Sequence, residues 1–382
     1  MKPKVYPFTA IKGQDPMKEA LILNLVNPAI GGVLIRGEKG TAKTTAVRGI
    51  SGILPGRKVV EIPMNATEDR VAGTIDLEYM LKNKKERFEP GLLKEADGQI
   101  LYVDEINLLE DHIVNLLLDA AATGVNTVER EGISVSHPSR FVLIGTMNPE
   151  EGRLRPQLLD RFGMVVDITG EKDPEVRVAI IKDRMAFEKD PAAFLRKYAK
   201  SQRELKEKIL LAQEILDEVS ISDELLLKAA EISIALGVQG HRADLSMIKT
   251  ARTLAAFRGE RTVNADDLKK AAFYVLPHRM RRSPLEKGEM DPAVLEELFC
   301  SFPQEEEEAR SLKRPSQKPE KASQSRKNEQ SKREQDREKQ IGETRRSDKR
   351  SRETRNADKQ SRETRNREKH KTGEASGISD AG

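Results

Sequence analysis

The sequence of 382 residues predicts an α/β domain built on a parallel sheet, followed by an all-helical domain. Across residues 1–185, apolar strand-like runs alternate with helical patterns, which is typical of a parallel sheet covered by helices; the runs are GVLIRG, KVVEIP, GQILYVDE, RFVLIGTMN and MVVDIT. Residues 186–303 lack such runs and place their apolar residues at helical spacing, with Ser222 and Asn264 as predicted N-caps. We therefore expect two structural domains before the C-terminal tail.

The tail, residues 304–382, differs in composition from the rest of the chain. It contains no Phe, Tyr or Trp, begins with four glutamates after Gln304, and repeats a ten-residue pattern from Glu343 onward. A segment with so few apolar side chains cannot offset the entropy cost of ordering, so we predict that the tail is disordered. An electrostatic tether for a partner protein is the alternative.

Charge and cysteine content limit the classes of function. The tail carries 23 Lys and Arg against 17 Asp and Glu, whereas residues 1–303 carry 44 against 46, so the basic excess lies outside the predicted fold. This argues against nucleic-acid binding as the function, since domains with that function usually cluster basic residues on the fold itself. Cys300 is the single cysteine, and no apolar run approaches the roughly 20 residues of a membrane span. We expect a cytoplasmic protein without a disulfide or a membrane anchor.

The stretch GEKGTAKTT, residues 37–45, follows an apolar strand and precedes a helical pattern. This is the context of a phosphate-binding loop, in which backbone N–H groups and a helix N-terminus surround the phosphates. Lys43 would reach the β- and γ-phosphates of ATP, and Thr44 would ligate Mg²⁺. Ala42 replaces the usual second glycine, which we expect to be tolerated if its φ angle is negative. The predicted nucleotide-binding residues of the loop are Gly37, Glu38, Lys39, Gly40, Thr41, Ala42, Lys43, Thr44 and Thr45.

Two further strands end in polar groups suited to ATP hydrolysis. ILYVDE ends in Asp104, which would hold Mg²⁺ together with Thr44, and in Glu105, which would polarise the attacking water. RFVLIGTMN ends in Asn148, which would position the same water. Arg161 follows in LRPQLLDRF at a predicted helix end, and the order of these motifs along the chain favours an arginine finger over a surface salt bridge.

With these motifs in this order, the sequence resembles the AAA+ ATPases, and more narrowly the ATPase (I) subunit of magnesium and cobalt chelatases. The resemblance covers roughly residues 5–285 and rests on stretches such as GTIDLE, RFEPGLLKEADGQILYVDEINLL, GTMNPEEGRLRPQLLDRFG and LPHRMRR. Alanine at the position of Ala42 also recurs in relatives of this family. The resemblance implies a P-loop NTPase fold with an AAA+ core, a helical lid domain, and ATP and Mg²⁺ as cofactors.

The resemblance also assigns residues that the motifs alone leave open. Arg242, in GHRADL at the start of a helical pattern, matches the second sensor arginine of the family. Whether it serves its own subunit or a neighbour stays open at this point. Ile11 and Gly13, in AIKGQD, match the segment on the adenine side of the nucleotide.

Two hairpin insertions are implied as well, within residues 76–93 and 126–141. The second has turn chemistry at Glu131-Gly132, followed by strand-like alternation. His137 lies in this hairpin, and no second His or Cys has metal-ligand spacing to it, so we expect His137 to be structural.

By resemblance, the chain would be the ATP-hydrolysing motor of a hexameric ring, with Arg161 acting on ATP bound by the neighbouring subunit. The ring would work with an integrin-domain subunit and a large catalytic subunit to insert Mg or Co into a tetrapyrrole. Some relatives continue into an integrin-like domain with an Asp-x-Ser-x-Ser metal motif, and this sequence lacks that motif. The chain itself has no His, Cys and Glu cluster that would hold the porphyrin.

Three other functions share some of these sequence features. A AAA+ chaperone that inserts metals or cofactors into proteins shares the core, but the chelatase-type GTIDLE and RFEPGLL weigh against it. A non-hydrolysing ring scaffold is disfavoured by the complete set of predicted catalytic residues. A nucleic-acid motor is supported by the basic tail alone, which lacks the interleaved aromatic residues of a stacking platform.

Overall fold

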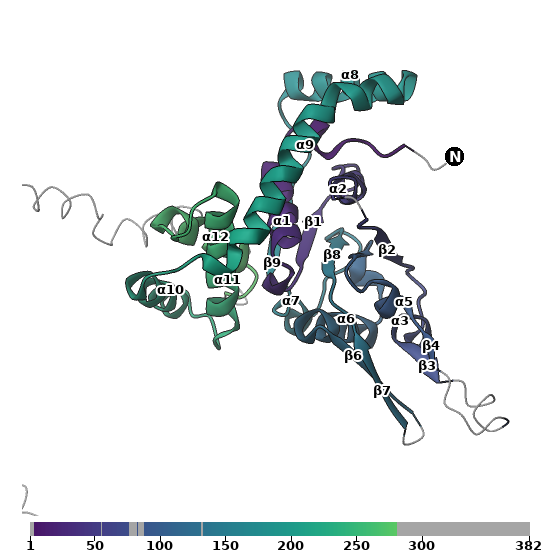
Figure 1. The fold of residues 1–382 in the computed structure, drawn as a ribbon, viewed down its shortest axis with the longest axis vertical. Coiled ribbons are helices and arrows are strands. Elements are labelled where there is room, and N and C mark those ends of the chain that lie inside the picture. The colour runs from purple at the N-terminus through teal and green to yellow at the C-terminus, as the bar shows by residue number, and fades with distance from the viewer. Residues whose placement is uncertain (1–3, 55, 76–81, 83–87, 131–132, 281–382) are drawn as a thin grey trace, which may run out of the picture. The chain divides into compact units, whose positions relative to one another are not determined.

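A five-stranded parallel sheet forms the centre of the N-terminal half, with the strand order β2-β5-β8-β1-β9 (Figure 1). The strands are β1 (Val33–Gly37), β2 (Val59–Ile62), β5 (Ile100–Val103), β8 (Val142–Met147) and β9 (Met164–Ile168). Each corresponds to one of the five predicted apolar runs, so the predicted parallel α/β core is confirmed. The three strands followed by predicted nucleotide motifs are neighbours, since β8 pairs with both β5 and β1.

The computed structural model describes residues 4–54, 56–75, 82, 88–130 and 133–280. The predicted disordered tail, residues 304–382, and the predicted turn at Glu131-Gly132 therefore lie outside the described residues, as does Cys300.

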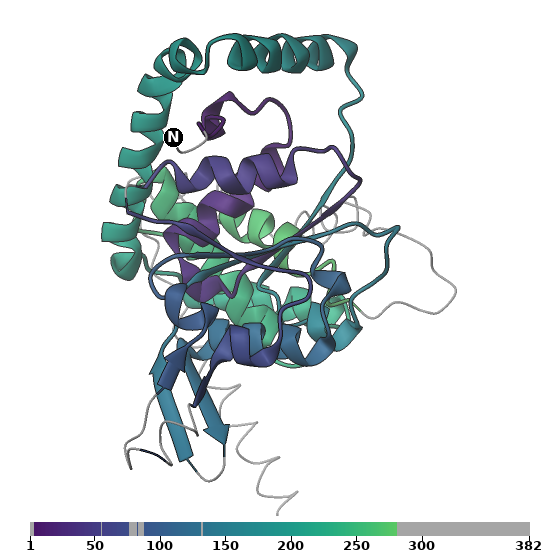
Figure 2. The same cartoon turned by 90° about the vertical axis from the view of Figure 1, so that its right-hand side faces the viewer.

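Helices cover both faces of the sheet, which explains why its strands are apolar throughout (Figure 2). One apolar cluster joins the sheet to α1 (Asp15–Val26) and α2 (Lys43–Ser51). The cluster on the other face joins it to α3 (Glu68–Ala72), α5 (Leu92–Glu95), α6 (Asp111–Thr123) and α7 (Pro156–Leu159). Short 3-10 turns span Phe8–Ala10, Pro28–Ile30, Ile106–Leu108 and Leu216–Glu218.

Two antiparallel hairpins extend from this core, as expected (Figure 1). The first pairs β3 (Gly73–Ile75) with β4 (Phe88–Pro90), and the second pairs β6 (Val125–Arg130) with β7 (Ile133–Pro138). His137 of β7 is buried, lies 3.1 Å from the Asn126 amide nitrogen through its Nε2, and packs its ring against Phe88. These contacts give His137 a packing role that links the two hairpins.

The helical part consists of α8 (Pro174–Lys189), α9 (Pro191–Ile215), α10 (Asp223–Ala235), α11 (Arg242–Arg258) and α12 (Ala265–Val275). The Ser222 hydroxyl caps α10 by accepting from the Leu225 N–H, and Asn264 forms a capping box with Asp267, so both predicted N-caps are confirmed. The predicted domain boundary after residue 185 falls inside α8.

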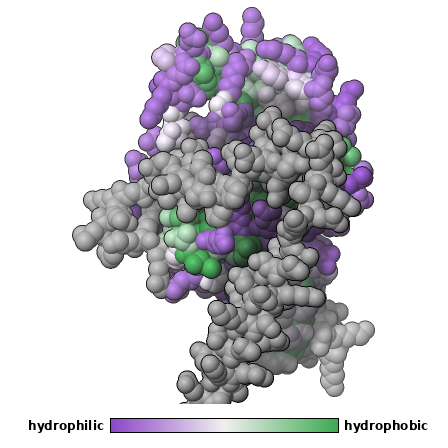
Figure 3. Space-filling view, turned by 90° about the vertical axis from the view of Figure 1, so that its left-hand side faces the viewer, coloured by the Kyte–Doolittle hydropathy of each residue, from purple (hydrophilic) through white to green (hydrophobic). Residues whose placement is uncertain are grey.

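The helical domain packs directly on the sheet domain. α11 and α9 contact α1, and α12 contacts the edge strand β9. Apolar residues of both domains belong to one buried cluster. In the helical domain, Leu227, Ile234 and Leu245 have exposed apolar side chains. Figure 3 shows one face of the molecule, on which apolar residues reach the surface between hydrophilic ones. None of the described helices combines the length and apolarity that a bilayer span needs.

Candidate nucleotide-binding site

The predicted phosphate loop connects the end of β1 to the start of α2. Gly37 ends β1 so close to β9 that a Cβ at this position would lie 2.4 Å from the Ile168 carbonyl oxygen, which explains the requirement for glycine. The loop and the first turn of α2 line a cavity of about 360 Å³, together with Asp104, Glu105 and Asn148. The three sequence motifs therefore converge on one space.

Ala42 does not meet the condition under which alanine was expected to be tolerated. That condition was a negative φ, but the residue has φ 65° and ψ 19°, in the left-handed region, where it is the N-cap of α2. The loop needs a left-handed turn at this point, and that geometry is independent of the residue occupying it. An L-residue in this conformation costs roughly 1–2 kcal/mol, since its Cβ approaches the following carbonyl oxygen. The usual glycine avoids this cost, and this chain bears it.

Lys43 and Thr44 face the cavity from the first turn of α2. The Lys43 ammonium donates to the Gly37 carbonyl at 2.6 Å and to the Glu38 carbonyl at 2.8 Å, so it is held over the loop. Partial burial lowers the pKa of Lys43, while the nearby Asp104 and Glu105 carboxylates oppose that shift. A desolvated ammonium beside a ring of backbone N–H groups is suited to binding a polyphosphate.

Asp104 is connected to Thr44 through a hydroxyl bridge. The Tyr102 hydroxyl donates to Asp104 Oδ1 at 2.8 Å and lies 3.2 Å from Thr44 Oγ1. Thr146 Oγ1 also donates to Asp104 Oδ1, at 2.5 Å. Burial raises the pKa of the Tyr102 phenol, so this group remains a protonated donor. The bridge fixes the Asp104 carboxylate and the Thr44 hydroxyl on the same side of the cavity.

This donor set fits Mg²⁺ and a nucleotide triphosphate. Mg²⁺ prefers hard oxygen ligands, is usually bound by one or two protein oxygens, and completes its shell with phosphate oxygens and water. Asp104 and Thr44 supply a carboxylate and a hydroxyl beside the phosphate loop. Within the described residues, no group of three or more His, Cys, Asp and Glu side chains forms a separate metal site.

Glu105 follows β5 in a strained conformation, with φ 49° and ψ 52°. Its N–H donates to Thr146 Oγ1 at 3.2 Å, which helps to hold the strained residue against β8. Burial and the neighbouring Glu151 carboxylate raise the pKa of Glu105. Glu151 in turn forms an ion pair with Lys39 of the phosphate loop, and this contact lowers its own pKa.

Asn148 is buried at the end of β8, where its side-chain oxygen accepts from the Glu150 N–H at 3.2 Å. It lines the same cavity as Glu105. A carboxylate and an amide therefore line the same cavity as the phosphate loop.

A second cavity, of about 930 Å³, lies on the other side of the phosphate loop. Ile11 lines it, as do Thr45 and residues of α8. Gly13 has φ 66°, and a Cβ there would lie 2.7 Å from a Glu171 carboxylate oxygen, so glycine lets this segment turn past the loop after β9. The structure thus brings the predicted adenine-side segment next to the phosphate loop.

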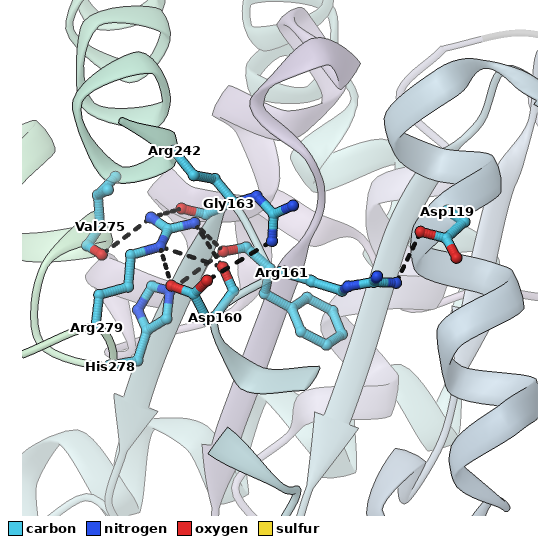
Figure 4. A network of polar contacts seen from close by, with 9 residues as sticks. Asp119, Asp160, Arg161, Gly163, Arg242, Val275, His278 and Arg279 are labelled. Carbon is cyan, nitrogen blue, oxygen red and sulfur yellow. Dashed lines mark hydrogen bonds and ion pairs between the residues drawn. The ribbon is translucent and has the colours of Figure 1, made fainter. Parts of the chain in front are cut away.

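The two predicted arginines lie elsewhere. Arg161 comes two residues after α7, in the turn before β9, and its Nη1 is 2.7 Å from Asp119 Oδ1 of α6. Arg242 begins α11 and lies 3.6 Å from Asp160 Oδ2 (Figure 4). Neither residue lines either of the two cavities described above. The structure therefore brings Arg161 and Arg242 near each other but does not bring them to the phosphate loop of their own chain.

Sequence reasoning missed Tyr102, Thr146 and Glu151. A signal for the first two was available, because side chains two positions apart in a strand point to the same face. Tyr102 precedes Asp104 by two residues, and Thr146 precedes Asn148 by two. Glu151 lies in a loop, where no such periodicity applies.

Comparisons with known proteins agree with this geometry. Residues 32–162 match the AAA domain of the dynein-related subfamily, and residues 226–298 match the AAA lid domain. The chain is 48% identical to a magnesium-chelatase subunit ChlI homolog of Methanocaldococcus jannaschii, over 79% of this chain and 92% of that one. It is 45% identical to the magnesium-chelatase subunit ChlI of Guillardia theta, over 78% and 96% of the two chains.

A crystal structure of a candidate ATPase from Cytophaga hutchinsonii has the same fold, with a TM-score of 0.56 and 18% identity over 77% of this chain and 91% of that one. The fold, the converging nucleotide motifs and the identity to full-length relatives lead to one assignment. The chain belongs to the ChlI family of magnesium-chelatase subunits, which are AAA+ proteins that use ATP and Mg²⁺.

Proposed function

We propose that this chain is the ATP-hydrolysing motor subunit of a chelatase that inserts a divalent metal, Mg or Co, into a tetrapyrrole. One observation carries the proposal. The phosphate loop and its cavity form one part of a nucleotide site, but Arg161 and Arg242, which would complete such a site, do not line that cavity in the same chain. Such a chain hydrolyses ATP only when copies assemble, which is how a ring motor couples subunits. Relatives named as magnesium-chelatase subunits support the chelatase assignment.

The residues at the carboxyl ends of β1, β5 and β8 would act within one subunit. Lys43 binds the β- and γ-phosphates, and Asp104 with Thr44 holds Mg²⁺, which neutralises charge on the phosphates when bound. Glu105 accepts a hydrogen bond from the attacking water, and Asn148 orients the same water. The raised pKa of Glu105 supports this role, because a carboxylate with a higher pKa is a stronger proton acceptor.

Arg161 and Arg242 would act on ATP held by the neighbouring subunit. An arginine finger typically contributes a factor of 10³ to 10⁵ in rate by stabilising charge on the transferred phosphoryl group. The 3.6 Å ion pair from Arg242 to Asp160, the residue next to Arg161, supports a common role for both arginines. Arg242 is therefore assigned to the same trans action as Arg161.

The proposed assembly is a head-to-tail hexamer. Its proposed partners are an integrin-domain chelatase subunit and a large catalytic subunit that holds the tetrapyrrole. A cytoplasmic location remains a prediction from the sequence. Affinity capture of the tagged chain from its own cells, followed by mass spectrometry, tests the partners. Recovery of metal-dependent enzymes in place of both chelatase subunits would favour the chaperone function instead.

Mixed rings test the trans arrangement. Lys43→Ala removes phosphate binding but leaves Arg161 intact, whereas Arg161→Ala retains ATP binding without the finger. Each variant alone should be nearly inactive. In a closed ring formed from equal amounts, roughly a quarter of interfaces join an intact Lys43 to an intact Arg161, so ATPase activity should recover toward that fraction.

Native mass spectrometry provides the control, since it shows whether mixed rings have formed. Mixed rings without recovered ATPase activity would contradict the trans assignment of Arg161. Arg242→Ala should recover ATPase activity when mixed with Lys43→Ala, because the Lys43→Ala subunit supplies both arginines. It should not recover activity when mixed with Arg161→Ala, because neither subunit then carries both arginines.

A further inference from the structure

The turn that follows α12 contacts the turn that carries Arg161 (Figure 4). Its central residue is Arg279, whose side chain is only 1% exposed. The two turns are separated by more than a hundred residues and belong to the helical domain and the sheet domain. A buried guanidinium between them requires partners for its five N–H donors.

Backbone carbonyls of the Arg161 turn supply most of those partners. The Arg279 guanidinium donates to the Asp160 carbonyl at 3.1 Å, the Phe162 carbonyl at 2.6 Å and the Gly163 carbonyl at 3.4 Å. It also donates to the Val275 carbonyl at the end of α12, at 3.2 Å. The residues on both sides of Arg161 are thus held by one side chain from the helical domain.

Two neighbours complete the arrangement. The Asp160 carboxylate lies 3.3 Å from Arg279 Nε and 3.6 Å from Arg242, so it pairs with two arginines of the helical domain. His278 is half-buried, with its Nε2 3.2 Å from the Phe162 carbonyl oxygen. Burial, reinforced by the adjacent Arg279, holds the pKa of His278 well below its ordinary value, so the ring is neutral and Nε2–H is the donor.

The burial of Arg279 does not neutralise it. Desolvation lowers its pKa to about 10, and the Asp160 carboxylate opposes that shift, so the guanidinium stays charged at neutral pH. A charged donor gives strong hydrogen bonds to carbonyls, and its planar shape fixes several of them at once.

We propose that Arg279 is a positioning residue for Arg161: from the helical domain, it fixes the backbone on both sides of the finger and so sets where the finger reaches. This inference rests on the proposed trans action of Arg161. It also means that a movement of the helical domain in one subunit would be transmitted to the ATP of the next, because the finger turn is bonded to both domains.

Arg279→Lys tests the proposal with the charge retained. A lysine has a single point donor in place of the planar fork, so it cannot bond the carbonyls of Asp160, Phe162 and Gly163 together. We expect kcat to fall about 100-fold, the loss typical of a 1 Å misplacement in a catalytic arrangement. KM for ATP should be unchanged, because the phosphate loop of the same subunit is intact.

Arg252→Lys is the matched control. Arg252 also lies in the helical domain and donates to backbone carbonyls, those of Val219, Leu216 and Asp217, but none of these belongs to the Arg161 turn. The control substitution removes the same kind of fork from the same domain, so it reports the effect of general destabilisation. Its kcat should remain within about 2-fold of the wild-type value.

Mixed rings separate positioning from a general loss of folding. Arg279→Lys should recover activity when mixed with Lys43→Ala, which supplies an intact finger, and should not recover when mixed with Arg161→Ala. Three results would overturn the proposal. They are recovered ATPase activity in the mixture of Arg279→Lys with Arg161→Ala, no recovered activity in its mixture with Lys43→Ala, and an unchanged kcat for Arg279→Lys alone. The reference mixture of Lys43→Ala with Arg161→Ala distinguishes a failure of the trans finger from a failure of the Arg279 proposal. If this mixture recovers no activity, the trans action of Arg161 is contradicted. If it recovers activity and one of the three contrary results is still found, only the role of Arg279 is contradicted.

Discussion

The edge that binds nucleotide and the edge that carries the arginines are built in different ways. At the nucleotide edge the backbone is strained. Among the described residues, three that are not glycine have a positive φ, namely Gln14, Ala42 and Glu105. All three line one or both of the two cavities. At the arginine edge no described residue other than glycine has a positive φ, and a buried side chain from a second domain holds the turn.

This difference indicates what fixes the geometry of the nucleotide edge and of the Arg161 turn. Strained conformations persist only where the surrounding structure fixes them, so the phosphate loop and the smaller cavity that it lines form a preorganised site within the sheet domain. The Arg161 turn depends on contacts between two domains, so its position follows the helical domain. The ring motor that we propose would need both properties, a preorganised pocket for ATP and a finger that responds to movement.

Glu105→Gln should have the largest effect on the nucleotide half. It retains the shape of the side chain but removes the charge that we propose polarises water, so ATP should still bind while hydrolysis falls by about 10²- to 10⁴-fold. ATPase assays with a parallel nucleotide-binding measurement check this. Glu110→Gln, which changes an exposed carboxylate at the start of α6, is the control.

The comparison also predicts how Glu105→Gln behaves in mixed rings. It leaves Arg161 intact, so it should restore activity to Arg161→Ala and not to Lys43→Ala. Unchanged ATP turnover in Glu105→Gln alone would remove this carboxylate from the mechanism.

The acid limb of the kcat pH profile should shift in opposite directions when Glu151 and Lys39, two charged neighbours of Glu105, are substituted one at a time. In the proposed role Glu105 has to be ionised to polarise water, so kcat should fall as the pH drops through its pKa, which burial and the Glu151 carboxylate raise above the ordinary glutamate value. Glu151→Gln removes a like charge that raises this pKa, so the acid limb should move to lower pH. Lys39→Met removes a cation that lowers it, so the limb should move to higher pH.

Measurement of kcat at saturating ATP separates this effect from weaker binding in the Lys39 variant. Arg252→Lys, whose guanidinium bonds carbonyls of the helical domain away from Glu105, should leave the position of the acid limb unchanged. Shifts of the same sign for Glu151→Gln and Lys39→Met would show that Glu105 is not the group that titrates.

Ala42→Gly should give the smallest effect and tests the strain directly. Glycine adopts positive φ without the Cβ penalty, although its more flexible unfolded state offsets part of the gain. We expect a net stabilisation of about 0.5–1 kcal/mol, seen as a rise of about 2 °C in the thermal midpoint. Ala186→Gly, in an exposed position within α8, should destabilise by about 1 kcal/mol instead. A lower midpoint for Ala42→Gly would show that Ala42 is not strained in solution.

The sequence by itself determined the five strands, the phosphate loop, and the roles expected of Lys43, Asp104 and Asn148. These features are local, because strand periodicity and the chemistry of a strand-to-helix loop depend on neighbouring residues. The carboxyl ends of adjacent parallel strands then have to meet at one edge of the sheet, so the motifs converge without further information.

Only the tertiary structure decided the conformation of Ala42 and the surroundings of the arginines. The left-handed turn at Ala42 is imposed by the loop between β1 and α2, whereas the sequence shows only which residue occupies it. The distance of Arg161 and Arg242 from their own phosphate loop, and the bonds from Arg279 to the Arg161 turn, depend on how the helical domain packs against α1 and β9. Contacts between residues more than a hundred positions apart leave no periodic signal in a single sequence, because packing of whole domains creates them.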